Sequence, residues 1–171
     1  MIQKDMEKKQ QNMTTLNHLD LTEIKIVEKK KTRYLGLVDI SQTNSMEEII
    51  DQSVIGAKKY HLHRLYNASY GSMLSVENIY RGNYDRYAAL YVELPTQLSE
   101  QALHLQPAGN YLRAFCRGNR DKLACRYRKI LTYANKHGIT FCDFAYEKGI
   151  NELFIDSFDD YITQIEIPIK T

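Results

Sequence analysis

The segment Gly109–Gly138, "GNYLRAFCRGNRDKLACRYRKILTYANKHG", places a strand directly before the clearest helix of the sequence. In residues 109–118 small or apolar side chains alternate with bulkier or charged ones, which is typical of a strand with two different faces. The helix runs from Asn119 to His137, and Gly138 supplies its C-terminal cap. Its apolar residues recur at helical spacing: Leu123, Tyr127, Ile130, Leu131 and Ala134. The segment therefore predicts a helix that covers one face of a β-sheet.

The same order of elements occurs twice along the chain. After this helix, residues 139–147 and 160–170 are predicted strands. In the first half the predicted elements are a strand (22–30), a second strand (32–40), a helix from residue 44 or 45 to about residue 66, and two more strands (72–77 and 86–95). Two strand–helix–strand–strand units, spaced by roughly 80 residues, predict an internal pseudo-repeat. We expect an α+β fold, a curved antiparallel sheet with helices on one side and a central ligand cleft between the open faces.

Length and composition exclude several classes of protein. The 171 residues suffice for one domain, and 43% hydrophobic with 26% charged residues are values of a soluble globular protein. No apolar run approaches the roughly 20 residues of a membrane span, and the charged N-terminus excludes a secretory signal. Three cysteines without a CxxC pair indicate a reduced, cytoplasmic protein. A net charge of +2 is too small for nucleic-acid binding by the whole domain.

The stretch "FCDFAYEKG" (Phe141–Gly149) resembles a half-buried strand, yet it carries an acid, Glu147, near its end. One interpretation is that Glu147 marks the point where the strand reaches water. The other is that Glu147 lies in an aromatic cleft and binds a cation, because burial disfavours an unpaired carboxylate. By alternation Phe141 shares the face of Glu147, whereas Lys148 points away from it.

Aromatic residues of other strands are candidates for the wall of this cleft, in a chain with thirteen tyrosines and no tryptophan. Tyr111 and Phe115 lie on the face of their strand that the helix leaves free, and so do Tyr87 and Tyr91 on theirs. For each, a pocket wall and an ordinary sheet surface remain open. The residues that would close the cleft at one end are Tyr34 and Met46.

Two further groups of residues carry weaker signals. His61 and His63 are two apart on a helix and point to different sides, so we expect no metal site. The outer face of the second helix is basic: Arg117, Arg120, Lys122, Arg126, Arg128 and Lys129. Such a face is either solvated or docks an acidic partner, DNA gyrase or the DNA backbone.

Several segments resemble a known family in order and spacing. They are "SVENIYRGNYDRYAALYVELP" (75–95), "PAGNYLRAF" (107–115) with the helix after it, "FAYEKG" (144–149) and "DDYITQIEIPIK" (159–170). They are similar to the GyrI-like effector-binding domain, which forms the C-terminal half of MerR-type multidrug-responsive transcription regulators. The resemblance covers residues 21–171, and residues 1–20 look like the end of the linker helix that precedes this domain. The sequence departs from the family at Lys148 and Gly149, which leaves the ligand's charge open.

The resemblance implies a site and its partners. Glu147 would lie at the base of an aromatic pocket for lipophilic, cationic ligands, and Tyr161 would face the ligand. With the wall residues above, the expected site comprises Glu147, Tyr161, Tyr111, Phe115, Tyr91, Tyr87, Phe141, Tyr34 and Met46. DNA would be bound only through a winged-helix half absent from this chain, and the N-terminal helix would form a homodimer.

Three functions follow as hypotheses. The first is a ligand sensor of a MerR-type regulator, with no catalytic residue, no metal and no cofactor. The second is a stand-alone GyrI-like hydrolase in which Glu147 is a general base and Tyr161 or Tyr111 an orienting group. The third is an inhibitor that docks a protein such as gyrase through its basic helix. We expect the first.

Overall fold

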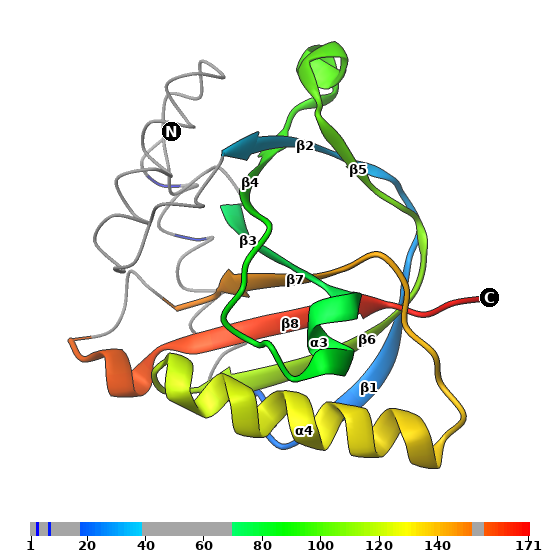
Figure 1. Ribbon diagram of the computed structural model, residues 1–171. Helices are drawn as coiled ribbons and strands as arrows, with labels where there is room; N and C mark the ends of the chain where they lie inside the picture. The colour runs from blue at the N-terminus through cyan, green and yellow to red at the C-terminus, as the bar shows by residue number, and fades with distance from the viewer. Residues whose placement is uncertain (1–2, 4–6, 8–17, 39–69, 152–155) are drawn as a thin grey trace.

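The computed structural model describes residues 3, 7, 18–38, 70–151 and 156–171, and its central feature is an eight-stranded antiparallel sheet (Figure 1). The strands are β1 (Ile24–Lys29), β2 (Arg33–Val38), β3 (Tyr70–Ser75), β4 (Ala89–Leu94), β5 (His104–Gln106), β6 (Gly109–Arg117), β7 (Phe144–Gly149) and β8 (Ile162–Pro168). The helices are α3 (Val76–Arg81) and α4 (Arg120–Lys136), with short 3-10 helices η1 (Thr96–Gln101) and η3 (Phe158–Asp160). The predicted α+β class is confirmed.

The strand order β1-β6-β8-β7-β3-β4-β2-β5 displays the predicted pseudo-repeat. The second unit contributes β6, β8 and β7 in that order, and the first contributes β2, β4 and β3 from the opposite edge. The two units meet where β7 pairs with β3. Each outer edge carries one added strand, β1 beside β6 and β5 beside β2. The predicted helix of the first unit lies outside the described residues, as does most of the predicted linker helix with its dimer contact.

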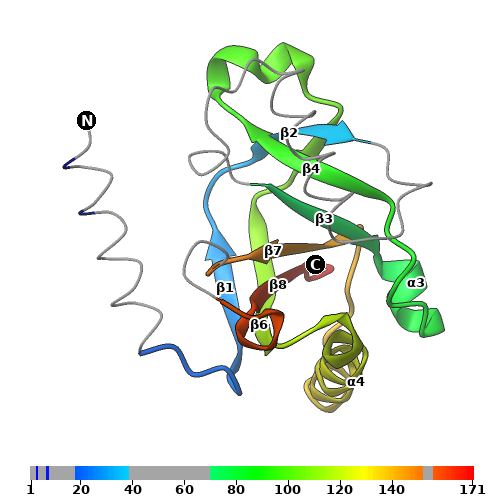
Figure 2. The ribbon, with the colours of Figure 1, turned by 90° about the vertical axis from the view of Figure 1, so that its left-hand side faces the viewer.

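Helices α3 and α4 pack on one side of the sheet, here called the helix face (Figure 2). The apolar stripe of α4 is buried there, as its spacing predicts. It packs against alternate residues of β6 and β8: Leu112, Ala114, Cys116, Ile165 and Ile167. Burial of each large apolar side chain contributes roughly 1.5–3 kcal/mol relative to exposure. This packing fixes which residues of the central strands lie beneath the helix.

The opposite side of the sheet, here called the concave face, holds a second cluster. Its buried members come from five strands: Leu35, Met73, Tyr91, Tyr111 and Tyr146. Leu35 lies on β2 and Tyr111 on β6, which four strands separate in the sheet order. Side chains so far apart in a flat sheet can share one cluster only if the sheet curls around them (Figure 1). The predicted curvature is therefore present.

Helix α3 and strand β5 were not expected from the sequence, and strand β7 begins later than predicted. Helix α3 has only six residues, which is fewer than two helical turns and too few to show a repeated apolar spacing. The Ser75 side chain caps its N-terminus, and Gly82 ends it in the left-handed region. Strand β5 lies in residues 96–107, where the sequence predicts only a connector. It was not predicted because three residues are too few to show alternation. Strand β7 begins at residue 144 since Asp143, with φ 60°, interrupts the strand predicted from residue 139.

The junction of the two units leaves no room for a side chain at Gly71. A Cβ there would lie 2.1 Å from the backbone oxygen of Glu147 and 2.7 Å from the hydroxyl oxygen of Tyr91. We therefore expect Gly71→Ala to lower the free energy of unfolding by roughly 1–3 kcal/mol, because the strands must separate. Gly82→Ala is the control, since its Cβ meets open space and only its φ of 79° opposes it. In denaturant titrations, a smaller loss at Gly71 than at Gly82 would contradict the prediction.

Candidate functional site

Glu147 is buried on the helix face, at the junction of the two units. Its side chain is 3% exposed, and its backbone pairs with Ser72 of β3 and Ile165 of β8. The Tyr87 hydroxyl donates a hydrogen bond to Oε1 at 2.8 Å, and the Tyr127 hydroxyl of α4 donates one to Oε2. Among the described residues no lysine or arginine bonds this carboxylate. It is therefore a buried acid held by two phenols.

The pKa of Glu147 is raised because burial disfavours its charged form. The hydrogen bonds from Tyr127 and Tyr87 oppose this shift and offset only part of it. Burial also raises the pKa values of Tyr87 and Tyr127, and the adjacent Glu147 raises both further. Both phenols thus remain protonated and can serve only as donors to the carboxylate. The site therefore holds a buried acid whose ionised form is bonded by no cation of the described residues.

The residues around Glu147 become more exposed from Tyr127 to Tyr87 to Arg120. Tyr127 is the inner phenol, fully buried and stacked on Tyr84 with ring centroids 5.3 Å apart. Tyr87 is half-buried and carries the Arg120 guanidinium 5.2 Å from its ring centroid. Arg120 itself is exposed, and its charge lowers the pKa of Glu147 slightly against the effect of burial. Of the two phenols that bond Glu147, Tyr87 is thus the one nearer to solvent.

The structure separates the predicted site residues onto two faces. Phe141 and Tyr87 belong to the helix face with Glu147, whereas Tyr91, Tyr111 and, by strand alternation, Phe115 lie on the concave face. The expectation that Glu147 and Tyr87 share a free face with Tyr91 and Tyr111 is therefore wrong. Tyr87 lies before the start of β4, so the alternation from Tyr91 does not extend to it. Glu147 lies two residues after Ala145 on β7 and therefore on the same face, and Ala145 is buried in the cluster beneath α4.

The remaining predicted site residues are less central. Tyr161 precedes β8 and is half-buried, and its backbone oxygen accepts a hydrogen bond from the Gly118 amide at 2.8 Å. Tyr34 is half-buried on β2 and faces away from the side of its neighbour Leu35. Met46 lies outside the described residues, as do His61 and His63.

Tyr127 was missed as a site residue because it fits the apolar stripe of α4. A signal was nevertheless present. A tyrosine at a fully buried helix position needs a partner for its hydroxyl, and no apolar residue supplies one. Only the tertiary structure identifies that partner as Glu147.

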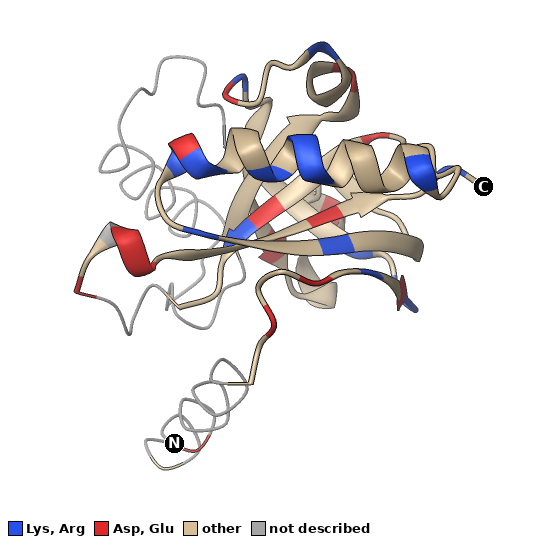
Figure 3. Cartoon of the chain, turned by 90° about the horizontal axis from the view of Figure 1, so that it is seen from below, with Lys and Arg blue, Asp and Glu red and all other residues tan. Residues whose placement is uncertain are grey.

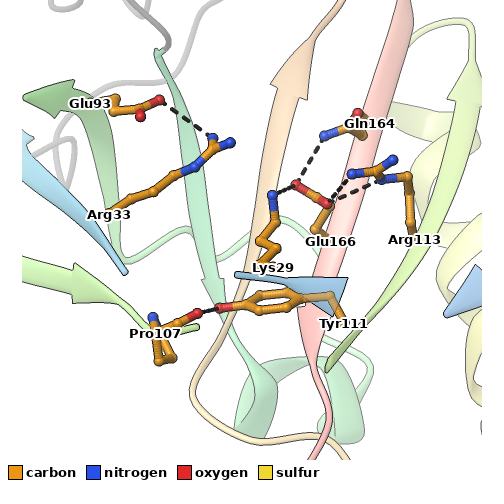
Figure 4. Close-up of polar contacts among 8 residues, drawn as sticks. All are labelled: Lys29, Arg33, Glu93, Pro107, Tyr111, Arg113, Gln164 and Glu166. Carbon is orange, nitrogen blue, oxygen red and sulfur yellow. Dashed lines mark hydrogen bonds and ion pairs between the residues drawn. The ribbon is translucent and has the colours of Figure 1, made fainter. Parts of the chain in front are cut away.

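A second buried glutamate lies on the concave face and differs in its partners (Figure 4). Glu166, 4% exposed, is bonded by Lys29 at 2.9 Å, by Arg113 at 2.9 and 3.1 Å, and by the Gln164 amide at 3.0 Å. Burial alone would raise its pKa, but Lys29 and Arg113 outweigh burial and hold the pKa below its ordinary value. Glu166 is thus neutralised by Lys29 and Arg113, whereas no cation among residues 18–38, 70–151 and 156–171 bonds Glu147.

The basic outer face predicted for α4 is present, but one of its members is engaged (Figure 3). Arg126 donates from Nε to the backbone oxygen of Phe115 at 2.8 Å. Its Nη2 donates to the backbone oxygens of Leu21, Thr22 and Glu23 at 3.1–3.3 Å. Arg126 therefore fastens the segment before β1 to α4 and is not free for docking.

Among the described residues, no group of three or more His, Cys, Asp or Glu is arranged to hold a metal ion. None of the helices in the described part of the chain is long and apolar enough to cross a membrane.

Comparison with solved structures supports the fold. The EcmrR C-terminal domain matches with a TM-score of 0.58 and 13% identity, over 87% of this chain and 96% of that one. EcmrR in its DNA complex matches with a TM-score of 0.56 and 16% identity, over 99% of this chain and 69% of that one. A hydrolase from Listeria innocua matches with a TM-score of 0.50 and 9% identity, over 92% of this chain and 97% of that one. No protein-family model and no curated protein matches the sequence. The expected fold of a regulator's effector-binding domain is confirmed.

Stability should depend on pH through Glu147. Its raised pKa means that the folded state keeps this proton where the unfolded chain loses it, so Glu147 makes the unfolding free energy fall as pH rises above 4.5. The loss is about 1.4 kcal/mol for each unit by which the pKa is raised. Because Glu147→Gln lacks this ionisation, we expect its stability relative to wild type to increase with pH in denaturant titrations.

Glu166→Gln is the matched control and should show the opposite sign. The lowered pKa of Glu166 contributes stability above its unfolded value, which is lost as pH falls. The Glu166→Gln variant should therefore lose stability relative to wild type as pH rises. If both variants show the same slope, the assignment of opposite pKa shifts is wrong.

Proposed function

We propose that this chain is a sensor domain that binds a lipophilic cation at Glu147 and passes occupancy to a DNA-binding partner or domain. The observation that supports it is the buried Glu147 carboxylate, which two tyrosines bond and no described cation neutralises. The fold shared with the EcmrR C-terminal domain is consistent with this role.

A ligand cation beside Glu147 would supply a positive charge, which none of the described residues places in contact with this carboxylate. It would favour the ionised carboxylate and offset the cost of its burial. Tyr87 is the outer phenol, and the Arg120 guanidinium above its ring marks a position where positive charge is already favourable. An aromatic cation could take the place of this guanidinium and contact the ring, gaining roughly 0.5–2 kcal/mol of cation–π attraction. A flat ring face with few directional donors would accept ligands of several shapes.

Helix α4 offers a route by which occupancy could reach the N-terminal segment. Tyr127 bonds Glu147, and the residue before it, Arg126, holds the backbone oxygens of Leu21, Thr22 and Glu23. A ligand that displaces the Tyr127 hydroxyl would shift α4 at the point where the N-terminal segment is attached. In this proposal the position of α4 depends both on the ligand at Glu147 and on the N-terminal segment held by Arg126.

Ligand binding can be tested by isothermal titration calorimetry with benzyl-alkyl quaternary ammonium ions and neutral amides of the same shape. We expect the cations to bind, and Glu147→Gln to weaken them about tenfold or more, since a bond or ion pair to a charged group contributes roughly 1.5–3 kcal/mol. The neutral amides should not respond to this substitution. Glu166→Gln, which removes the same charge from the concave face, should leave cation affinity unchanged. Loss in Glu166→Gln with retention in Glu147→Gln would contradict the assignment.

The second candidate is a hydrolase, favoured by the raised pKa of Glu147 between two phenols, a setting suited to a general base. The partners expected from the sequence, Tyr161 and Tyr111, are replaced by Tyr127 and Tyr87, because Tyr111 lies on the concave face. One solved structure with this fold is named a hydrolase, at 9% identity. Turnover of a strained electrophile such as an epoxide, lost in Glu147→Gln, would favour this function over sensing.

The route through Arg126 predicts a local change in hydrogen exchange. We expect Arg126→Ala to increase amide exchange in residues 21–24, because the hydrogen bonds that hold this segment to α4 are lost. Arg128→Ala removes an exposed arginine of the same helix and should have no such effect. A bound ammonium ion should alter exchange in residues 21–24 of the wild type and not of the Arg126 variant. Equal protection in both variants would remove the basis for this route.

A further inference from the structure

Four cations of the described residues lie on the concave face: Lys29, Arg33, Arg113 and Lys148. The carboxylates that form ion pairs with three of them are Glu93 and Glu166. Glu166 is bonded by Lys29 and Arg113, and Glu93 by Arg33 at 3.4 Å (Figure 4). Every carboxylate of this group therefore already has a partner.

Of these four cations, Lys148 is the one for which the described residues supply no carboxylate partner. It lies on β7, one of the two central strands, and its pairing with Gln164 places it on the side of Glu166, away from Glu147. This confirms the alternation expected for it. Lys148 is half-buried, and among the described residues it makes no hydrogen bond and no ion pair. Burial lowers its pKa, and Arg33 and Lys29 lower it further, although Glu166 and Glu93 act in the opposite direction. Within the described part of the chain, this ammonium has no anion bonded to it.

The aromatic residues of the concave cluster lie on the same face of the sheet as Lys148. Tyr146 is two residues before Lys148 on β7, and its ring packs against Tyr91 and Tyr111 with centroids 5.9 and 6.4 Å apart. The Tyr146 hydroxyl lies 2.7 Å from Nε2 of His104 on the edge strand β5. The side chain of Arg33 is 37% exposed and that of Arg113 28%, so solvent reaches the cationic part of the face.

From this arrangement we propose that the concave face binds an aromatic carboxylate, whose anionic group is held by Lys148 with Arg33 beside it. The ring of the ligand lies against the rim of the concave cluster, where Val27, Leu37 and Phe144 are only partly buried. This site is distinct from the acid at Glu147, because neighbouring residues of β7 point to opposite faces. It selects the opposite ligand charge, since the acids on this face are neutralised by the chain itself.

The probe for this site is 2-naphthoate, with 2-naphthamide as its neutral counterpart, and calorimetry as the measurement. We expect naphthoate to bind about tenfold or more tightly than the amide, because a hydrogen bond to a charged group exceeds one between neutral groups. Lys148→Met should abolish this difference and Lys148→Arg should restore it. Lys122→Met, which removes an exposed lysine of α4, should leave it unchanged.

Two further readouts keep the test decisive. In the free protein Lys148→Met should not lower the melting temperature, because it removes a half-buried charge without a partner. Glu147→Gln should leave naphthoate affinity unchanged, so this site and the proposed cation site can fail independently. Equal affinity for naphthoate and naphthamide, or naphthoate binding that survives Lys148→Met, would overturn the proposal.

Discussion

The pairing of β3 with β7 is the constraint on which the rest of this molecule depends. It joins the two strand units in register, with Ser72 opposite Glu147, and it requires a glycine at position 71. Because side chains alternate along β7, this register assigns each residue of "FAYEKG" to one face of the sheet. The carboxylate of Glu147 goes beneath α4, and the ammonium of Lys148 goes to the concave face.

The two buried glutamates show how the chain treats charge on each face. Glu166 receives cations from β6 and from β1, the strand beyond β6, and an amide from its own strand, and its pKa is lowered. In the described part of the chain, the side-chain donors to Glu147 are two phenols, and its pKa is raised. A phenol stabilises a carboxylate by a hydrogen bond but adds no charge, so Glu147 retains a demand for a cation. The helix face and the concave face therefore differ in how the described residues compensate a buried carboxylate.

Much of the architecture could be predicted from periodicity. The stripe of α4 and the alternation of β6 both identify their buried faces, and the same pattern in two halves predicts the symmetric strand order. The three-residue strand β5 and the six-residue helix α3 could not be predicted this way, because three residues are too few to show alternation and six residues are fewer than two helical turns. The site was predicted in part: Glu147 was identified as a buried acid among aromatic rings, but it was assigned to the wrong face.

The sequence by itself determined the antiparallel α+β class, the helix that covers the second unit and the opposite orientations of Glu147 and Lys148, because these depend on local period. Only the tertiary structure decided that Tyr87 and Tyr127 bond Glu147, since they come from segments 60 and 20 residues away. It also decided that Lys29 on β1 and Arg113 on β6 reach Glu166. Such contacts depend on sheet register and curvature, which no local pattern encodes.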